Sequence, residues 1–205
     1  MRNGMVSDRL NDMRLVLFLT ALMTAPVAAA QDYQSAPAVN ARRAGDGGEA
    51  YASMDVRAPP AAVWSVLADC SQARRYMARL ISCRILERGE GWEVREHRVR
   101  GWPLRPALRN VSRLDFTPNR LLTFAAIEGD WTRSYGEWRL TPIDGGHGTR
   151  VEYRLDAALA GGLPPSLSQA SLIDTVRRTL VALRRESERA RTQASAASTG
   201  AGSQN

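Results

Sequence analysis

The sequence at residues 136–155 is GEWRLTPIDGGHGTRVEYRL, and its apolar residues alternate on both sides of a glycine-rich turn. This alternation predicts two antiparallel strands that are joined as a hairpin. One face of the hairpin would be buried, because side chains at every second position of a strand point the same way. The buried face would consist of Gly136, Trp138, Leu140, Val151, Tyr153 and Leu155.

A helical pattern follows this hairpin. Apolar residues recur at positions i, i+4, i+8 and i+11, namely Leu172, Val176, Leu180 and Leu183. Arginine and glutamate occupy many of the other positions, which is the pattern of an amphipathic helix. Such a helix must bury its apolar stripe, and we expect the concave face of the preceding sheet to be its partner.

Further strand-like segments precede the hairpin, and turn residues bound each of them, so they predict an antiparallel meander. These segments cover residues 81–85, 92–100, 108–116 and 121–128. Upstream, residues 49–57 alternate as a strand, and Ala58-Pro59-Pro60 opens the first of two short helices that end near Met77. A curved sheet around one long helix leaves a hollow between them, so this order of elements favours an α+β protein that holds a ligand.

The first thirty residues have the pattern of a secretory signal. A basic start precedes an apolar stretch of roughly a dozen residues, and small residues lead up to Gln31. The stretch is shorter than the ~20 apolar residues that span a bilayer. We therefore expect the chain to be exported, with the periplasm as the expected compartment. Met1, Met5 and Met13 all remain candidate starts.

Two other segments are rich in small and polar residues. Residues 31–48 have no apolar period and predict a flexible lead-in. Residues 192–205 predict a disordered tail, because they cannot bury enough apolar surface to offset the entropy of ordering. Residues 49–191 remain as a single ligand-binding domain of roughly 140 residues, the usual size for one domain.

The formal net charge is +7, and every basic residue is arginine. These arginines are spread over strands and the last helix, so we expect no nucleic-acid partner. An ordinary solvated surface and attraction to an anionic membrane surface both stay open. Cys70 and Cys83 are the only cysteines; they could form a disulfide worth ~3 kcal/mol in an oxidising compartment, or pack as small apolar residues. Because the sequence has only two cysteines and two histidines, we expect no zinc site, no other metal and no cofactor.

Three stretches resemble the START-like (SRPBCC) superfamily, of the polyketide cyclase/dehydrase and coenzyme Q-binding type. They are residues 56–69, residues 136–140 followed by 148–153, and Leu163-Pro164-Pro165, with Trp102-Pro103-Leu104 as a weaker similarity. The resemblance spans residues 49–191. It implies a helix-grip fold, in which an antiparallel sheet of about seven strands surrounds a long C-terminal helix and leaves an apolar cavity. It also implies a hydrophobic or lipid-like ligand, but not one reaction, because members of one fold differ in function.

A cavity between sheet and helix gives a set of candidate ligand-binding residues. They are Met77, Leu80, Trp92, Val94, Glu96, Arg98, Trp102, Leu114, Trp138, Tyr153, Leu172, Val176 and Leu180. If Trp92 and Val94 face the cavity, period-two alternation places Glu96 and Arg98 there as well. That pair could orient a ligand headgroup. The alternative is that both side chains reach water, and His97 would lie on the opposite side of this strand.

The sequence contains no nucleophile elbow, paired-histidine spacing or phosphate-binding glycine loop, so we assign no catalytic residue. We therefore expect non-covalent binding of a hydrophobic small molecule or lipid. One alternative is a cyclase or dehydratase in which Glu96 or Arg98 assists proton transfer. A second alternative is an envelope module whose basic last helix binds an anionic membrane surface.

Overall fold

The eight strands form one antiparallel sheet with the order β1-β2-β8-β7-β6-β5-β4-β3. This computed structural model describes residues 31–101, 106–159 and 169–201. The strands are β1 (Ala38–Ala44), β2 (Gly47–Val56), β3 (Leu80–Gly89), β4 (Trp92–Val99), β5 (Leu108–Thr117), β6 (Leu121–Gly129), β7 (Trp131–Ile143) and β8 (Gly148–Leu159). Strands that follow one another along the chain pair as antiparallel neighbours, except β2 and β3: β2 pairs with β1 and β8, and β3 pairs only with β4.

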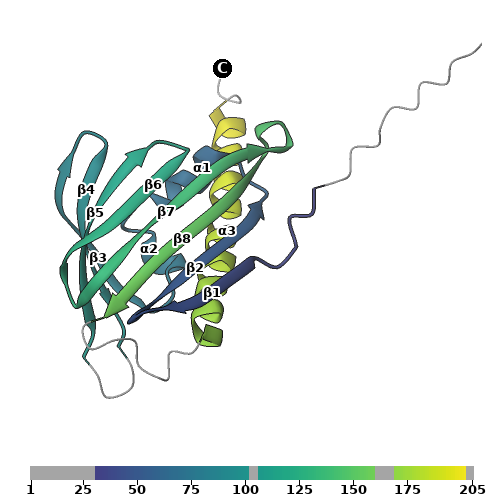
Figure 1. Ribbon diagram of the computed structural model, residues 1–205. Helices are drawn as coiled ribbons and strands as arrows, with labels where there is room; N and C mark the ends of the chain where they lie inside the picture. The colour runs from purple at the N-terminus through teal and green to yellow at the C-terminus, as the bar shows by residue number, and fades with distance from the viewer. Residues whose placement is uncertain (1–30, 102–105, 160–168, 202–205) are drawn as a thin grey trace, which may run out of the picture. The chain divides into compact units, whose positions relative to one another are not determined.

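Three α-helices accompany the sheet. Helices α1 (Pro60–Leu67) and α2 (Ala73–Tyr76) connect β2 to β3, which lie on opposite sides of the sheet. Helix α3 (Gln169–Ala201) is the last element of the described chain. A short 3₁₀ turn, η1 (Asp144–Gly146), closes the β7–β8 hairpin. Helix α3 packs against α1, α2, β1 and β2, and Figure 1 shows it running along one face of the curved sheet. The helix-grip arrangement that the sequence predicts is confirmed.

The curvature of the sheet has a local cause in its strands. Register shifts place an extra residue in β3, in β6 opposite Val111 and Ser112 of β5, and in β7 between Trp131 and Arg133. An extra residue of this kind bends a strand and increases its twist. The bent strands leave room between the sheet and α3 at the end where β5 and β7 begin.

The β7–β8 hairpin has the register that its sequence predicts. Trp138 pairs with Tyr153, Gly136 with Leu155 and Leu140 with Val151. Trp138, Leu140 and Val151 are buried. Across from them, Val176, Leu180 and Leu183 of α3 are buried as well, as their helical spacing predicts. These two elements form the centre of the core.

The segment predicted to be a flexible lead-in instead contains β1 and the start of β2. Val39 and Ala41 face the core from β1, and Ala44 pairs with Gly47 across a two-residue turn. That turn needs the positive φ of 59° that Gly45 adopts, which is the usual role of glycine in a tight hairpin. The prediction of seven strands was therefore one short, because β1 is a short edge strand with a weak apolar alternation.

Helix α3 continues through Ala201, so residues 192–201 are helical rather than disordered as predicted. Residues 192–197 are exposed, and the helix buries none of them. Alanine is the best helix former, and adding residues to an existing helix avoids the cost of nucleation. Thr192 Oγ1 also donates a hydrogen bond to the Glu188 carbonyl at 3.0 Å.

Cys70 and Cys83 are joined by a disulfide, with their Cα atoms 5.6 Å apart. The bond ties the loop between α1 and α2 to the edge strand β3. The predicted signal at residues 1–30 and the stretch Leu163-Pro164-Pro165 lie outside the described residues. In the described chain, no helix is both long enough and apolar enough to cross a membrane.

Candidate functional site

A cavity of about 440 Å³ lies between the sheet and the helices α2 and α3. Its walls come from the inner face of β4 to β8, from the segment after α2 and from the first turns of the described part of α3. The apolar part of the lining consists of Leu67, Tyr76, Met77, Ala78, Val99, Leu108, Leu114, Leu122, Phe124, Trp138, Tyr153, Leu155, Ala157, Leu172 and Val176. The polar part consists of Arg79, Arg95, His97, Arg100, Asn110, Ser112, Trp131, Ser134, Ser171, Asp174, Thr175, Arg178 and Thr179.

Aromatic rings build one wall of the cavity. The ring centroids of Trp138 and Tyr153 lie 4.1 Å apart, and those of Phe124 and Tyr153 lie 6.5 Å apart. On the helical side, the Tyr76 hydroxyl donates to the Leu67 carbonyl at 3.0 Å. Burial raises the pKa of both Tyr76 and Tyr153, so both phenols stay neutral at any physiological pH. This wall offers contact area and no charge.

A buried ion pair lies on the inner face of β4. Arg95 is 3% exposed, and its Nε donates to Glu93 Oε2 at 2.7 Å. A second nitrogen of Arg95 donates to the Ala68 carbonyl, and the guanidinium lies 5.5 Å from the centre of the Phe116 ring. Its charge is therefore largely satisfied within the protein, although Arg95 lines the cavity.

His97 is a buried titratable side chain in the polar part of the cavity lining. Burial first, and then the nearby charge of Arg95, lowers the pKa of His97 from 6.5 to about 4. Its Nε2 atom is buried and has no hydrogen-bond partner. The imidazole is thus neutral at neutral pH and presents a ring nitrogen to the cavity.

This shift predicts a pH-dependent stability. The unfolded chain takes up a proton on His97 near pH 6.5, whereas the folded chain does so only near pH 4. The free energy of unfolding should therefore fall by up to about 3 kcal/mol between these pH values as the pH is lowered. Urea unfolding of the wild type and of His97→Gln across pH 4–7 measures this as a difference in slope. Parallel pH profiles for the two proteins would rule the effect out.

The structure describes twelve of the thirteen predicted site residues and places them in three groups. Six of the thirteen line the cavity: Met77, Leu114, Trp138, Tyr153, Leu172 and Val176. Leu80 and Leu180 instead pack in the hydrophobic core beside it. Trp102 lies outside the described residues. That the six bind a ligand stays a prediction.

The remaining four residues, Trp92, Val94, Glu96 and Arg98, were assigned to the wrong face of β4. The cavity is lined by Arg95, His97 and Val99 from this strand. Trp92 lies on the outer face, where the Arg113 guanidinium covers its ring at 4.5 Å. The apolar residues Trp92 and Val94 lie on the face that the aliphatic parts of arginine side chains cover. They do not lie on the face that points toward α3.

Glu96 belongs to an arginine network on that outer face. Arg109 Nε donates to Glu96 Oε2 at 2.6 Å, and Arg84 and Arg98 approach Oε1 at 3.5 and 3.6 Å. The hydrogen bond from Arg109 is the main cause that holds the pKa of Glu96 below its usual value. Glu96 is only 6% exposed, so it is a nearly buried carboxylate that arginines pair on the outer side of the sheet. The proposed proton transfer by Glu96 or Arg98 in the cavity has no geometric support.

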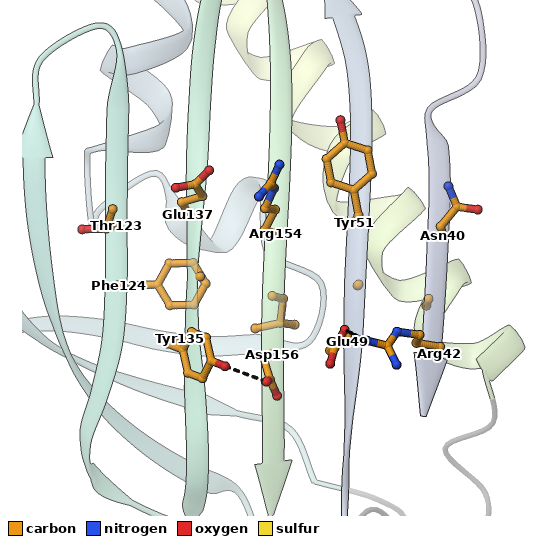
Figure 2. A pocket seen from close by; sticks show the side chains of 14 residues that line it. Asn40, Arg42, Glu49, Tyr51, Thr123, Phe124, Tyr135, Glu137, Arg154 and Asp156 are labelled. Atoms are coloured by element: carbon orange, nitrogen blue, oxygen red, sulfur yellow. Dashed lines mark hydrogen bonds and ion pairs between the residues drawn. The ribbon is translucent and has the colours of Figure 1, made fainter. Parts of the chain in front are cut away.

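A second hollow, of about 840 Å³, lies over the outward side chains of β1, β2, β8, β7 and β6. Figure 2 shows Tyr135, Asp156, Glu49 and Arg42 in a row across the strands. These groups satisfy one another: the Tyr135 hydroxyl donates to Asp156 at 2.8 Å, and Arg42 pairs with Glu49. We therefore place the candidate site in the smaller cavity, which has the larger apolar wall and contains buried polar atoms that no described residue pairs with. No group of metal-ligating side chains occurs among the described residues.

Comparison with solved structures supports the fold. A STAR-related lipid transfer protein from Xanthomonas axonopodis matches with a TM-score of 0.64 at 19% identity, over 78% of this chain and 97% of that one. The Zhui aromatase/cyclase from Streptomyces matches with a TM-score of 0.57 at 25% identity, over 73% and 95%. A human lipid transfer and protein localization domain matches with a TM-score of 0.63 at 13% identity, over 76% and 86%.

Comparison with sequences gives the family. No curated protein matches the chain significantly. The model of one family, described as polyketide cyclase / dehydrase and lipid transport, matches residues 56–184, which is more than half of the chain. The match begins at the end of β2 and runs through the cavity-lining part of α3, so it contains most of the site. The chain therefore belongs to the polyketide cyclase/dehydrase and lipid transport family, as its sequence resemblance predicts.

Proposed function

We propose that this chain is an exported carrier that holds a hydrophobic small molecule or lipid, without covalent chemistry, in the cavity between the sheet and α3. The observation that carries the proposal is the largely apolar cavity of about 440 Å³. Ligand sites usually have volumes of roughly 300–1,000 Å³ and the same mixture of apolar walls and a few polar groups. Each 100 Å² of apolar ligand surface removed from water would contribute about 2.5 kcal/mol, before association costs.

Export is the second part of this proposal. Its support is the signal-like pattern of residues 1–30 together with the Cys70–Cys83 disulfide, since disulfides persist in oxidising compartments. Cell fractionation with an antibody against the chain tests it directly. A chain recovered in the cytosol with residues 1–30 intact would contradict export and leave the ligand proposal standing.

Blocking the cavity tests where the ligand binds. Ala157 on β8 is buried and lines the cavity, so Ala157→Phe would place a ring in the space the ligand needs. We expect an at least tenfold loss of affinity for bound lipid, measured by native mass spectrometry and by the ligand-induced rise in melting temperature. Thr175→Phe, on the α3 wall of the cavity, is a second variant if Ala157→Phe folds poorly.

Arg154→Phe is the matched control. It adds the same ring on the same strand, but Arg154 is exposed and lines the outer hollow. Its affinity should equal that of the wild type. If Arg154→Phe loses affinity and Ala157→Phe keeps it, the ligand binds on the outer face. If wild-type protein purified gently carries no lipid and no apolar compound raises its melting temperature, the carrier function is wrong.

A cyclase or dehydratase is the second candidate, because the neutral His97 imidazole lies in the cavity. A general base works best when its pKa is near the operating pH. A pKa of about 4 makes His97 a weak base at neutral pH, and this favours binding over proton transfer. Turnover of a polyketide-like substrate that disappears in His97→Gln would reverse that preference.

Several arginines of α3 give little support to a membrane-surface role. Arg178 pairs with Asp174, Arg185 and Arg189 pair with Glu186, and Arg184 donates to the Ser35 carbonyl at 2.8 Å. Paired charges attract an anionic surface less than free ones. We therefore keep anionic membrane binding outside the proposed function.

A further inference from the structure

Three buried polar atoms of the cavity wall lack a hydrogen-bond partner. They are Nε2 of His97, Oδ1 of Asn110 and Nε1 of Trp131, and all three residues line the cavity. Within the described ranges, only two other buried side-chain atoms are in this state, on Arg184 and Ser187 of α3. The unpaired atoms are thus concentrated where a ligand would lie.

The fold brings these three side chains to one end of the cavity. His97 of β4 and Asn110 of β5 are direct register partners, and directly opposite side chains on one face of a sheet are in contact range. The Asp130 N–H donates to the Arg109 carbonyl at 2.8 Å, which places the start of β7 beside Asn110. Trp131, the next residue, therefore lies at the same end of the cavity. Leu122 of β6 and Trp138 of β7 lie further from this end.

Such a cluster is unusual without a ligand. Buried polar groups are nearly always hydrogen-bonded in proteins, since an unpaired one loses its hydration and gains nothing in return. Neighbouring polar groups of the lining do not fill the gap. Arg95, the nearest charged group on the inner face of β4, is already bonded to Glu93 and to the Ala68 carbonyl. No described residue pairs with these three atoms, so we look for their partner in water or in a ligand.

The chemistry of the three atoms defines that partner. The Trp131 indole N–H can only donate, the Asn110 amide oxygen can only accept, and the neutral His97 ring nitrogen can do either according to its tautomer. A hydroxyl group both donates and accepts, so it can pair with Trp131 and Asn110 together. A carboxylate has no proton to give and would set a negative charge against the Asn110 oxygen. A hydrocarbon would leave all three atoms unpaired.

We propose that the ligand carries an uncharged hydroxyl group, alcoholic or phenolic, which accepts from Trp131 Nε1 and donates to Asn110 Oδ1 beside His97. Its hydrocarbon part then lies between the aromatic wall and α3. This inference rests on the proposed function, because it assigns the ligand class of the same cavity. The hydroxyl would take the place of any water at this end without losing hydrogen bonds.

Three fluorescent probes of one ring system test the proposal on the purified full chain: pyrene, 1-hydroxypyrene and 1-pyrenecarboxylate. We expect 1-hydroxypyrene to bind about tenfold or more tightly than pyrene, and the carboxylate to bind no better than pyrene. Asn110→Leu and Trp131→Phe should each remove most of this advantage, measured within each variant as the ratio of its affinities for 1-hydroxypyrene and pyrene. Asn40→Leu makes the same substitution at an exposed site on β1 and should change none of the three affinities.

The outcomes separate the two levels of the proposal. Equal affinities for pyrene and 1-hydroxypyrene would overturn the hydroxyl subsite and leave the carrier function standing, with water as the partner of the three atoms. Tightest binding of 1-pyrenecarboxylate would also overturn it and would indicate an anionic headgroup. Failure of all three probes to bind would contradict the carrier function itself. Trp131→Phe supplies an independent reading if Asn110→Leu does not fold.

Discussion

Replacing Arg95 by methionine is expected to lower the free energy of unfolding by about 3 kcal/mol. Arg95 is 3% exposed, and its removal leaves the buried carboxylate of Glu93 without its 2.7 Å partner. Losing one member of a buried pair usually costs about 3–5 kcal/mol. The lower value applies here, because Arg88 still reaches Glu93 Oε1 at 2.8 Å. Urea unfolding followed by circular dichroism measures the change.

Two variants control this experiment. Asp115→Asn breaks the surface pair with Arg113, in which both side chains are about half exposed, and should cost less than about 0.5 kcal/mol. The double variant Glu93→Leu, Arg95→Met removes both charges and should recover much of the loss, because apolar side chains can replace a buried ion pair at little cost. If Arg95→Met is as mild as Asp115→Asn, the pair does not stabilise the inner face of β4.

The sequence predicts the architecture because the periodic spacing of apolar residues is clearest in the elements that form the centre of the core. The β7–β8 hairpin and the apolar stripe of α3 each follow a single period, and the residues that this period selects are buried or partly buried. The edge strand β1 escaped prediction for the opposite reason. An edge strand with one neighbour buries little, and its decisive feature is the two-residue turn at Gly45 and Asp46. That turn is readable as a hairpin signal, although it lies in a segment that otherwise looks like a linker.

The candidate site was harder to predict than the fold. The apolar wall of the cavity could be predicted from the pattern of core residues. Its polar end could not, because Trp92 and Val94 suggested that the opposite face of β4 lines the cavity. Arginine side chains cover that face, and no sequence period shows such coverage. One signal was available: His97 and Asn110 occupy the inner face once the strands pair antiparallel, and both are polar. A polar pair facing a helix-covered cavity indicates a ligand contact rather than core packing.

Replacing Leu180 by alanine is expected to destabilise the fold by about 3–5 kcal/mol. Leu180 is fully buried in the middle of α3, among core residues that α1, β2 and β8 contribute. The loss combines the transfer free energy of the missing methyl groups with the cavity that they leave, since rigid strands and helices on all sides prevent collapse. Chemical unfolding of the two proteins at the same pH gives the difference directly.

Val181→Ala is the control, because Val181 is the next residue on the same helix and is 48% exposed. It should change the free energy of unfolding by less than about 0.5 kcal/mol, so equal effects of the two substitutions would mean that α3 does not pack as described. The position of Leu180 gives the experiment a second use. Leu180 packs in the core while Val176, one turn earlier, lines the cavity. Leu180→Ala should therefore weaken the packing of α3 against the sheet, but the molecules that remain folded should keep their affinity for the ligand. The experiment thus separates the packing of α3 from ligand binding.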